Sequence, residues 1–241
     1  MNPMARKKIV FVIVEGPSDD TALSVILNKI FSRDNVFVHI THGDITTETD
    51  ANSTNIVTRI HNEVKKYADS NHLKKMHFRQ IIHLLDMDGA YIPDTAIIDD
   101  PNAEKAKYYL DRICTKNVEK IKLRNEKKRG CLNRISIITD VCNIPYQAYY
   151  MSCNLDHVLF NSQNLSEEEK ENNAYAFAKQ YKDDIPSFVQ FISDDSFAMK
   201  GSYTDTWAYI KKELHSLERH SNFNLCIDLA LSEEAQDVHQ S

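Results

Sequence analysis

The fold class is indicated by the segment Lys7-Lys8-Ile9-Val10-Phe11-Val12-Ile13-Val14-Glu15-Gly16-Pro17-Ser18-Asp19-Asp20. A continuous apolar run, rather than an alternating one, is typical of a strand buried on both faces, so residues 8–14 predict a central strand. The Gly-Pro-Ser-Asp segment supplies a turn and a helix start. Apolar residues then recur at three- and four-residue spacing, which predicts an amphipathic helix over residues 20–31.

A second apolar run ends in the same way, in Gln80-Ile81-Ile82-His83-Leu84-Leu85-Asp86-Met87-Asp88-Gly89. Between the two runs, residues 36–40 predict a short strand and residues 53–69 a helix. This alternation indicates an α/β fold, with a parallel sheet flanked by helices. Ligands of such sheets bind at the carboxyl ends of the strands, where Glu15, Asp86 and Asp88 are expected.

The composition sets broad limits on what the chain does. Its 241 residues, 42% hydrophobic and 27% charged, suit a folded domain with an appendage. The net charge of -6 gives no global preference for nucleic acid, so any such contact needs a local patch. The 5 scattered cysteines form no C-x-x-C pair and indicate free thiols in a reducing cytosol. No signal-peptide cleavage region or membrane span is evident, and we expect a cytoplasmic protein.

The rest of the chain is predicted to form a basic helical insertion and a helical C-terminal portion. The expected organisation is an α/β domain over residues 1–160, with the insertion at about 101–130, and a portion over 161–241 that packs on the core. The expected elements are a helical segment over 101–129, strands over 134–139 and 148–152, a helix opening at 156–160, an acidic helix over 164–184 with a Ser166–Glu169 capping box, and a last helix over 203–218 that packs through Trp207, Ile210, Leu214 and Leu217.

The acids after the two apolar runs predict a site for a hard cation. Mg²⁺ prefers oxygen ligands and takes one or two carboxylates while keeping several waters. Residues i and i+2 of a strand point the same way, so Asp86 and Asp88 are placed to share an ion. Glu15 would complete the site or act as general base, and Asp19 would face the same crevice. The alternative is that such acids only cap helices, as Asp19 or Asp20 would.

Val12-Ile13-Val14-Glu15-Gly16-Pro17-Ser18-Asp19, followed by a helix and later by Leu84-Leu85-Asp86-Met87-Asp88, resembles the Toprim domain. This is the metal-binding α/β module of topoisomerases, primases, OLD-family nucleases and small RNA maturases. The resemblance spans residues 7–160 and implies a Toprim-like sheet with Mg²⁺ or Mn²⁺ as cofactor. It further implies that Glu15 is a general acid/base or metal ligand and that Asp86 and Asp88 are metal ligands.

The short chain favours the compact OLD-like and RloB-like nucleases among Toprim proteins, which are associated with phage defence. The resemblance therefore implies metal-dependent cleavage of DNA or RNA, with a partner ATPase or another defence subunit. Ser152-Cys153-Asn154-Leu155-Asp156-His157 loosely resembles the RloB-like Ser-Asn-Pro-x-Phe-Glu segment, which adds Asn154 and Asp156 as site candidates, with His157 beside them. By the same resemblance, Lys200 corresponds to the lysine that contacts the scissile phosphate in OLD-type nucleases. The alternative is a solvated surface lysine.

The basic insertion offers a local patch for nucleic acid. A phosphate backbone would be attracted to it, with affinity that falls as salt rises. The alternative is a solvated helix face whose charges pair with Glu119 and Glu126. The candidate nucleic-acid-binding residues are Lys120, Lys122, Arg124, Lys127, Lys128 and Arg129.

Two other functions stay open. Asp86-Met87-Asp88-Gly89 also resembles the first motif of haloacid-dehalogenase-like phosphatases, with Asp86 as nucleophile. Against this, Ala90 stands where that family has Thr, a strand–helix unit precedes the motif, and Glu15 has no role. The second alternative is a non-catalytic Toprim-like binding module. A Glu15→Gln variant separates the nuclease from the phosphatase.

Overall fold

The computed structural model describes residues 7–238, with side chains to residue 233, and its centre is a five-stranded sheet. The strand order is β2-β1-β3-β8-β7, and β2, β1, β3 and β8 run parallel. Only the short edge strand β7 is antiparallel. The predicted α/β class with a mostly parallel sheet is confirmed. The strands are β1 (Ile9–Val14), β2 (Asn35–Ile40), β3 (Phe78–Asp86), β7 (Asp140–Val141) and β8 (Ile144–Met151).

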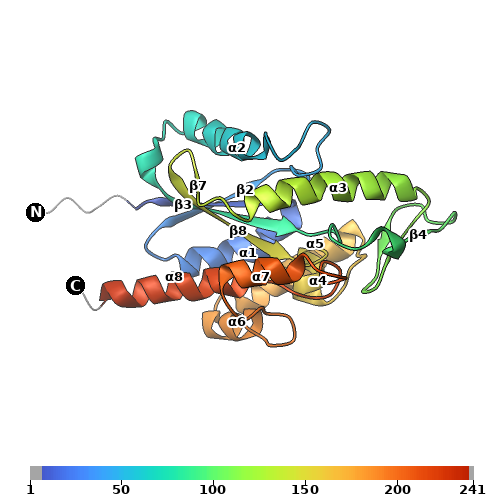
Figure 1. Cartoon of the computed structure of the whole chain (residues 1–241). Helices are drawn as coiled ribbons and strands as arrows, with labels where there is room; N and C mark the ends of the chain where they lie inside the picture. Colours follow the sequence, from blue (N-terminus) through green and yellow to red (C-terminus); the bar gives the residue numbers. More distant parts are fainter. Residues whose placement is uncertain (1–6, 239–241) are drawn as a thin grey trace, which may run out of the picture.

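Helices cover both faces of the sheet (Figure 1). In this view α2 and α3 lie above the strands, whereas α1, α5, α6 and α8 lie below them. None of the helices in the described part of the chain is both long and apolar enough to cross a membrane. The helices are α1 (Pro17–Ile30), α2 (Ile56–Ser70), α3 (Val118–Ile135), α4 (Leu155–Phe160), α5 (Glu167–Tyr181), α6 (Ile185–Ile192), α7 (Tyr203–Ile210) and α8 (Phe223–Val238), with 3-10 turns at Lys75–His77 and Asp94–Ala96.

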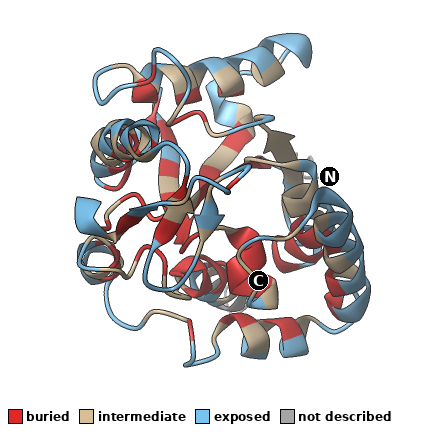
Figure 2. Cartoon of the chain, turned by 90° about the vertical axis from the view of Figure 1, so that its right-hand side faces the viewer, coloured by how far each residue is buried: buried red, intermediate tan, exposed pale blue. Residues whose placement is uncertain are grey.

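The continuous apolar run of β1 is explained by burial on both sides. Val10 and Val12 pack with α1, α5, α6 and α8, whereas Phe11 and Ile13 pack with α2 and α3. Every residue of β1 is buried. Figure 2 shows the buried strands at the centre, enclosed by helices whose outer faces are exposed. Because successive side chains of a strand point to opposite faces, only an unbroken apolar sequence fills both layers.

The turn after β1 starts α1 as the sequence indicates. Pro17 occupies the first turn of the helix, where its missing N–H costs no hydrogen bond. The Asp19 carboxylate accepts a hydrogen bond from the Gly16 N–H at 2.9 Å. The helix therefore begins at residue 17, three residues before the predicted start.

The predicted helix over 101–129 is wrong in its first half. Residues 97–115 form a small sheet of β4 (Ile97–Asp99), β5 (Lys107–Tyr108) and β6 (Ile113–Thr115), and the helix begins only at Val118. The Asn117 side chain accepts a hydrogen bond from the Lys120 N–H and so caps α3. The small sheet has its own apolar cluster of Ile92, Ile97, Ile113, Ile121 and Leu217.

The predicted strand over 134–139 is also wrong, because α3 continues to Ile135. Cys131, Leu132 and Ile135 extend the buried face of the helix against the main sheet, at three- and four-residue spacing. The strand that enters the sheet is Ile144–Met151, which contains most of the predicted 148–152 strand.

The helices after residue 161 differ from the prediction in number. The predicted 164–184 helix is α5, with the Ser166–Glu169 capping box present, and a second helix, α6, follows at Ile185. The last predicted helix ends at Ile210, so Leu214 and Leu217 lie in the loop beyond it. A further helix, α8, follows that loop and was not predicted.

Candidate functional site

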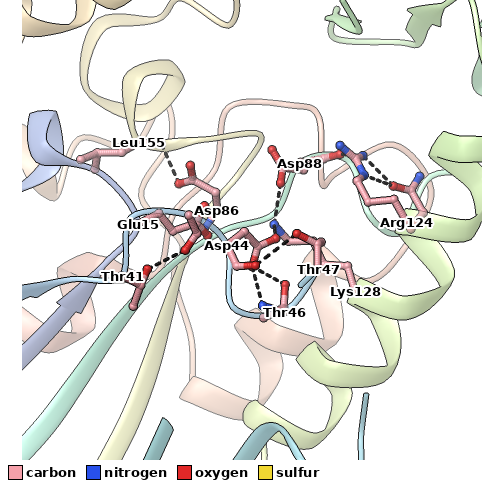
Figure 3. A network of polar contacts seen from close by, with 12 residues as sticks. Glu15, Thr41, Asp44, Thr46, Thr47, Asp86, Asp88, Arg124, Lys128 and Leu155 are labelled. Atoms are coloured by element: carbon pink, nitrogen blue, oxygen red, sulfur yellow. Dashed lines mark hydrogen bonds and ion pairs between the residues drawn. The ribbon is translucent and has the colours of Figure 1, made fainter. Parts of the chain in front are cut away.

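Three neighbouring parallel strands deliver acidic residues to the same edge of the sheet: Glu15 follows β1, Asp44 follows β2, and Asp86 ends β3. β1 and β3 are adjacent, with Ile13 opposite His83, so Glu15 and Asp86 leave the sheet side by side. His83 itself is buried and hydrogen-bonded to Tyr146. Figure 3 shows Glu15, Asp44, Asp86 and Asp88 grouped beyond the strand ends.

Glu15 and Asp86 form the centre of this group. The backbone N–H of Asp86 donates to Oε1 of Glu15 at 3.3 Å, and Oδ1 of Asp86 accepts from the Leu155 N–H at 3.0 Å. Burial, and then repulsion by Asp44, raises the pKa of Glu15 well above its usual value. Burial, and then repulsion by Glu15, does the same to the pKa of Asp86. This pair is short of compensating positive charge.

If the strand continued, the side chains of Asp86 and Asp88 would point to the same face. In the structure they point in different directions. Strand β3 ends at Asp86, and Asp88 has a left-handed backbone with φ of 49°. Its N–H donates to the Cys153 carbonyl at 2.7 Å. Figure 3 shows the Asp86 carboxylate turned toward Leu155 and the Asp88 carboxylate turned toward Lys128. Strand alternation therefore does not align the two carboxylates, and their sharing of one ion stays a prediction.

Lys128 lies inside the acidic site rather than on an exposed basic face. Its side chain is 0% exposed, and its Nζ lies 2.6 Å from Oδ2 of Asp88 and 2.7 Å from Oδ2 of Asp44. Burial lowers the pKa of Lys128, but attraction to Asp44 and Asp88 outweighs burial and raises the pKa well above its usual value. α3 thus delivers one fixed positive charge to the carboxylates.

Asp44 is a site residue that the sequence analysis missed. It follows β2 in the loop, and it accepts hydrogen bonds from the N–H and the hydroxyl of Thr46 at 2.8 and 2.5 Å. Burial alone would raise the pKa of Asp44, but the Lys128 ammonium holds that pKa below its usual value. The available signal was a third short apolar strand followed by an acid, Ile40-Thr41-His42-Gly43-Asp44.

The other basic residues of α3 do not form one open surface. Arg124 is half-buried, and its guanidinium donates to the Asp88 carbonyl at 2.7 Å. Lys127 donates to the carbonyls of Glu48 and Thr49, and Arg129 donates to the Ala90 carbonyl. Lys122 pairs with Glu119, and Lys120 is exposed. Several of these cations therefore hold loops of the acidic site.

A small crevice of about 180 Å³ opens beside Glu15 and Asp86. Asp19, Asp156 and Lys170 also line it, and Lys170 reaches it from α5, with its Nζ 3.9 Å from Oδ2 of Asp156. Burial raises the pKa of Asp156 to about 6. Acidic residues at the ends of β1 and β3 and a lysine from α5 thus line the same crevice.

The remaining candidates have structural contacts of their own. Asn154 caps α4 by accepting a hydrogen bond from the His157 N–H at 2.9 Å, and the His157 ring is buried. Burial lowers the pKa of His157 to about 4. Lys200 is 75% exposed, pairs with Asp195, and does not line the crevice.

The donor set fits a hard cation bound by few protein ligands. No three His, Cys, Asp or Glu side chains within residues 7–233 are arranged to enclose a metal ion. Mg²⁺ in proteins, however, is commonly held by one or two carboxylates and several waters. Glu15 and Asp86 supply half-buried carboxylates whose pKa values are raised by burial and by repulsion from neighbouring acids, which a bound cation would offset.

Comparison with protein-family models, with curated proteins and with solved structures found no match. The Toprim resemblance stays a prediction that rests on the residues quoted for it.

Proposed function

We propose that this protein is a Mg²⁺- or Mn²⁺-dependent hydrolase of nucleic-acid phosphodiesters, with its reacting centre at Glu15 and Asp86. The observation that supports it best is the contact between these two residues. Their carboxylates come from adjacent strands, lie beside an open crevice, and carry raised pKa values. Perturbed carboxyl groups in a cleft at the carboxyl ends of parallel strands favour a reaction site over a helix cap.

The four carboxylates of the site differ in how far positive charge compensates them. Lys128 forms ion pairs with Asp44 and Asp88 and offsets part of their charge, and its single positive charge leaves net negative charge at the site, where Glu15 and Asp86 lie beside the crevice. When bound there, a divalent cation supplies Lewis-acid stabilisation of charge on the phosphoryl oxygens. Glu15 accepts a proton from the attacking water, a role that suits a carboxylate with a raised pKa. Lys170 lies across the crevice and offers a positive charge to the phosphate.

The biological setting follows from the resemblance alone. DNA or RNA would be the substrate, phage defence the context, and an ATPase or another defence subunit the partner. The phosphatase with Asp86 as nucleophile is the competing function at the same site. The contact between Glu15 and the Asp86 backbone supports the nuclease, because the phosphatase leaves Glu15 without a chemical task.

The test is a cleavage assay on DNA and RNA with Mg²⁺, Mn²⁺ or a chelator. We expect metal-dependent cleavage that Asp86→Asn abolishes and that Glu15→Gln lowers on the order of 100-fold or more. Asp99→Asn is the matched control, because Asp99 is an exposed aspartate at the end of β4. Undiminished cleavage by Asp86→Asn overturns the proposal. Phosphomonoester hydrolysis that survives Glu15→Gln but not Asp86→Asn would identify the phosphatase instead.

A further inference from the structure

A cleft of about 490 Å³ lies at the other end of β8 from the acidic site. Tyr146 and Gln147, near the start of β8, form part of it, whereas Met151 at the end of the strand lies opposite Asp86. The volume is in the range of small-molecule sites in proteins. The cleft is completed by α7 and by the connection from α3 to β7, through Ser136, Ile137, Ile138, Thr139, Tyr203, Thr204, Trp207, Ala208 and Lys211.

Most of the lining surface is apolar, and part of it is aromatic. Trp207 and Tyr203 lie next to each other, with ring centroids 6.4 Å apart. Ile137 is 68% exposed, which is high for an isoleucine. An exposed apolar side chain at the mouth of an aromatic cleft is typical of a ligand site.

Among the side chains that the structure describes, Lys211 is the only charged one that lines this cleft, and it is half-buried. Its Nζ donates to the Ser136 hydroxyl at 2.9 Å and lies 5.4 Å from the centroid of the Trp207 ring. No carboxylate with a described side chain pairs with it, whereas exposed Lys29 and Lys200 each have an aspartate partner. Burial lowers the pKa of Lys211 without an acidic neighbour to restore it. An anionic ligand would supply the missing counter-charge.

We propose that this cleft binds a small planar aromatic anion, with the ring against Tyr203 and Ile137 and the anionic group at Lys211. The Ser136 hydroxyl donates to the Asn133 carbonyl and accepts from Lys211, and so holds the ammonium in place. An aromatic carboxylate and a nucleoside monophosphate share this chemistry, so both are tested. The proposal does not depend on the reaction at Glu15 and Asp86.

Trp207 is the one tryptophan of the chain, so its fluorescence reports on this cleft directly. The probes are salicylate and adenosine monophosphate, each compared with its neutral counterpart, salicylamide or adenosine. We expect saturable quenching by at least one anion, with its neutral counterpart bound about tenfold more weakly. Binding of salicylate would indicate an aromatic carboxylate as the ligand, and binding of adenosine monophosphate would indicate a nucleotide.

Variants of Lys211 test the charge. Lys211→Met is expected to remove the preference for the anion, and Lys211→Arg to keep it. Ala208→Leu narrows the cleft and should weaken the binding of the anion and of the neutral probe to the same extent. Lys200→Met is the matched control and should bind as the wild type does, since Lys200 lies outside the cleft. Circular dichroism establishes that each variant is folded. Absence of saturable quenching by either anion overturns the proposal, as does an unchanged anion preference in Lys211→Met.

Discussion

Lys128 is the residue on which the charge balance of the acidic site depends. Its ammonium contacts Asp44 from the loop after β2 and Asp88 from the turn after β3. A buried lysine between two carboxylates offsets their repulsion and its own desolvation only while all three groups are present.

Removal of this ammonium is expected to destabilise the fold. In Lys128→Met, Asp44 and Asp88 stay close together without a counter-charge, and we expect a loss of about 3 kcal/mol in the free energy of unfolding. Urea denaturation measures it. Lys200→Met, which breaks only an exposed ion pair, should change the free energy by less than about 0.5 kcal/mol. Adding Asp44→Asn to Lys128→Met should recover part of the loss, and an unchanged midpoint in the single variant would contradict this account.

Glu15 makes stability depend on pH in a direction set by its raised pKa. Below about pH 4 the carboxyl is protonated in the folded and the unfolded chain alike. As pH rises, the unfolded chain releases the proton first, so the free energy of unfolding falls until the folded-state pKa is passed.

Glu15→Gln removes this dependence, and in the presence of a chelator it should be more stable than the wild type at pH 8. We expect thermal melting about 2–4 °C higher, which corresponds to about 1 kcal/mol. The difference should shrink as the pH is lowered toward 4. A variant that melts below the wild type at pH 8 would show that Glu15 stabilises the fold as a carboxylate.

Cation binding can be measured without any assay of cleavage. A ligand that binds only the folded chain raises its stability by about 2.7 kcal/mol at a hundred times its Kd. Mg²⁺ or Mn²⁺ should therefore raise the melting temperature of the wild type and of Asp99→Asn, but not that of Asp86→Asn. An equal rise in all three proteins would place the ion elsewhere.

The residues of the site differ in how visible they are in the sequence. Glu15, Asp86 and Asp88 follow long apolar runs, so their position at the strand ends was predictable. The position of Lys128 in the site was not predictable. The sequence of α3 fits a solvated face and a nucleic-acid-binding face equally well, and only the packing of the helix on the sheet shows that this side chain is buried. Asp44 was obscured by a loop of polar residues that resembles an ordinary connection.

At the scale of the elements, the turn after β3 fixes the direction of the Asp88 carboxylate. Gly89 has a left-handed backbone with φ of 65°, and its N–H donates to the Ser216 carbonyl at 3.1 Å. A Cβ at Gly89 would lie 2.6 Å from Cδ2 of Leu217. Neither the backbone nor the packing leaves room for a side chain.

Gly89→Ala is therefore expected to lower the free energy of unfolding by about 2 kcal/mol, through strain and overpacking. Gly130→Ala is the matched control, because Gly130 lies within α3 and a Cβ there meets nothing closer than 3.9 Å. That variant should be more stable than the wild type by up to about 1 kcal/mol. Equal effects of the two substitutions on urea unfolding would contradict the account of the turn.

The elements that the sequence predicted correctly are those with a long periodic or continuous apolar signal. β1, β3, α1 and α2 belong to this group. Strands of two or three residues, as in β4–β6, are too short to show a period, so basic residues around them resembled a helix. α8 was missed because its apolar residues merge with the loop that follows α7, where Leu214 and Leu217 continue a helical spacing without a helix.

At the scale of the whole molecule, the helices after residue 161 share a core with the strands before it. Phe177, Phe188 and Phe223 belong to the same apolar cluster as Val12 of β1 and Leu23 of α1. Without them, one face of the sheet would be left uncovered, which is unfavourable in proportion to the apolar area exposed.

Residues 1–160 alone are therefore expected not to fold. We predict that this fragment shows no cooperative thermal transition by circular dichroism and is digested by protease at concentrations that leave the full chain intact. The full chain is the control in both measurements. A cooperative transition in the fragment would instead make the first 160 residues an independent domain.

The loop after α7 bears on when the acidic site can exist during synthesis. The Ser216 carbonyl accepts hydrogen bonds from the N–H groups of both Gly89 and Cys153, and so ties together the turns that follow β3 and β8. A ribosome must have synthesised residue 216 before this carbonyl can join them. Glu15 emerges early, but the site around it cannot close until the loop after α7 has followed. For an enzyme proposed to cut nucleic acid, we expect a nascent chain that ends before this loop to lack cleavage activity.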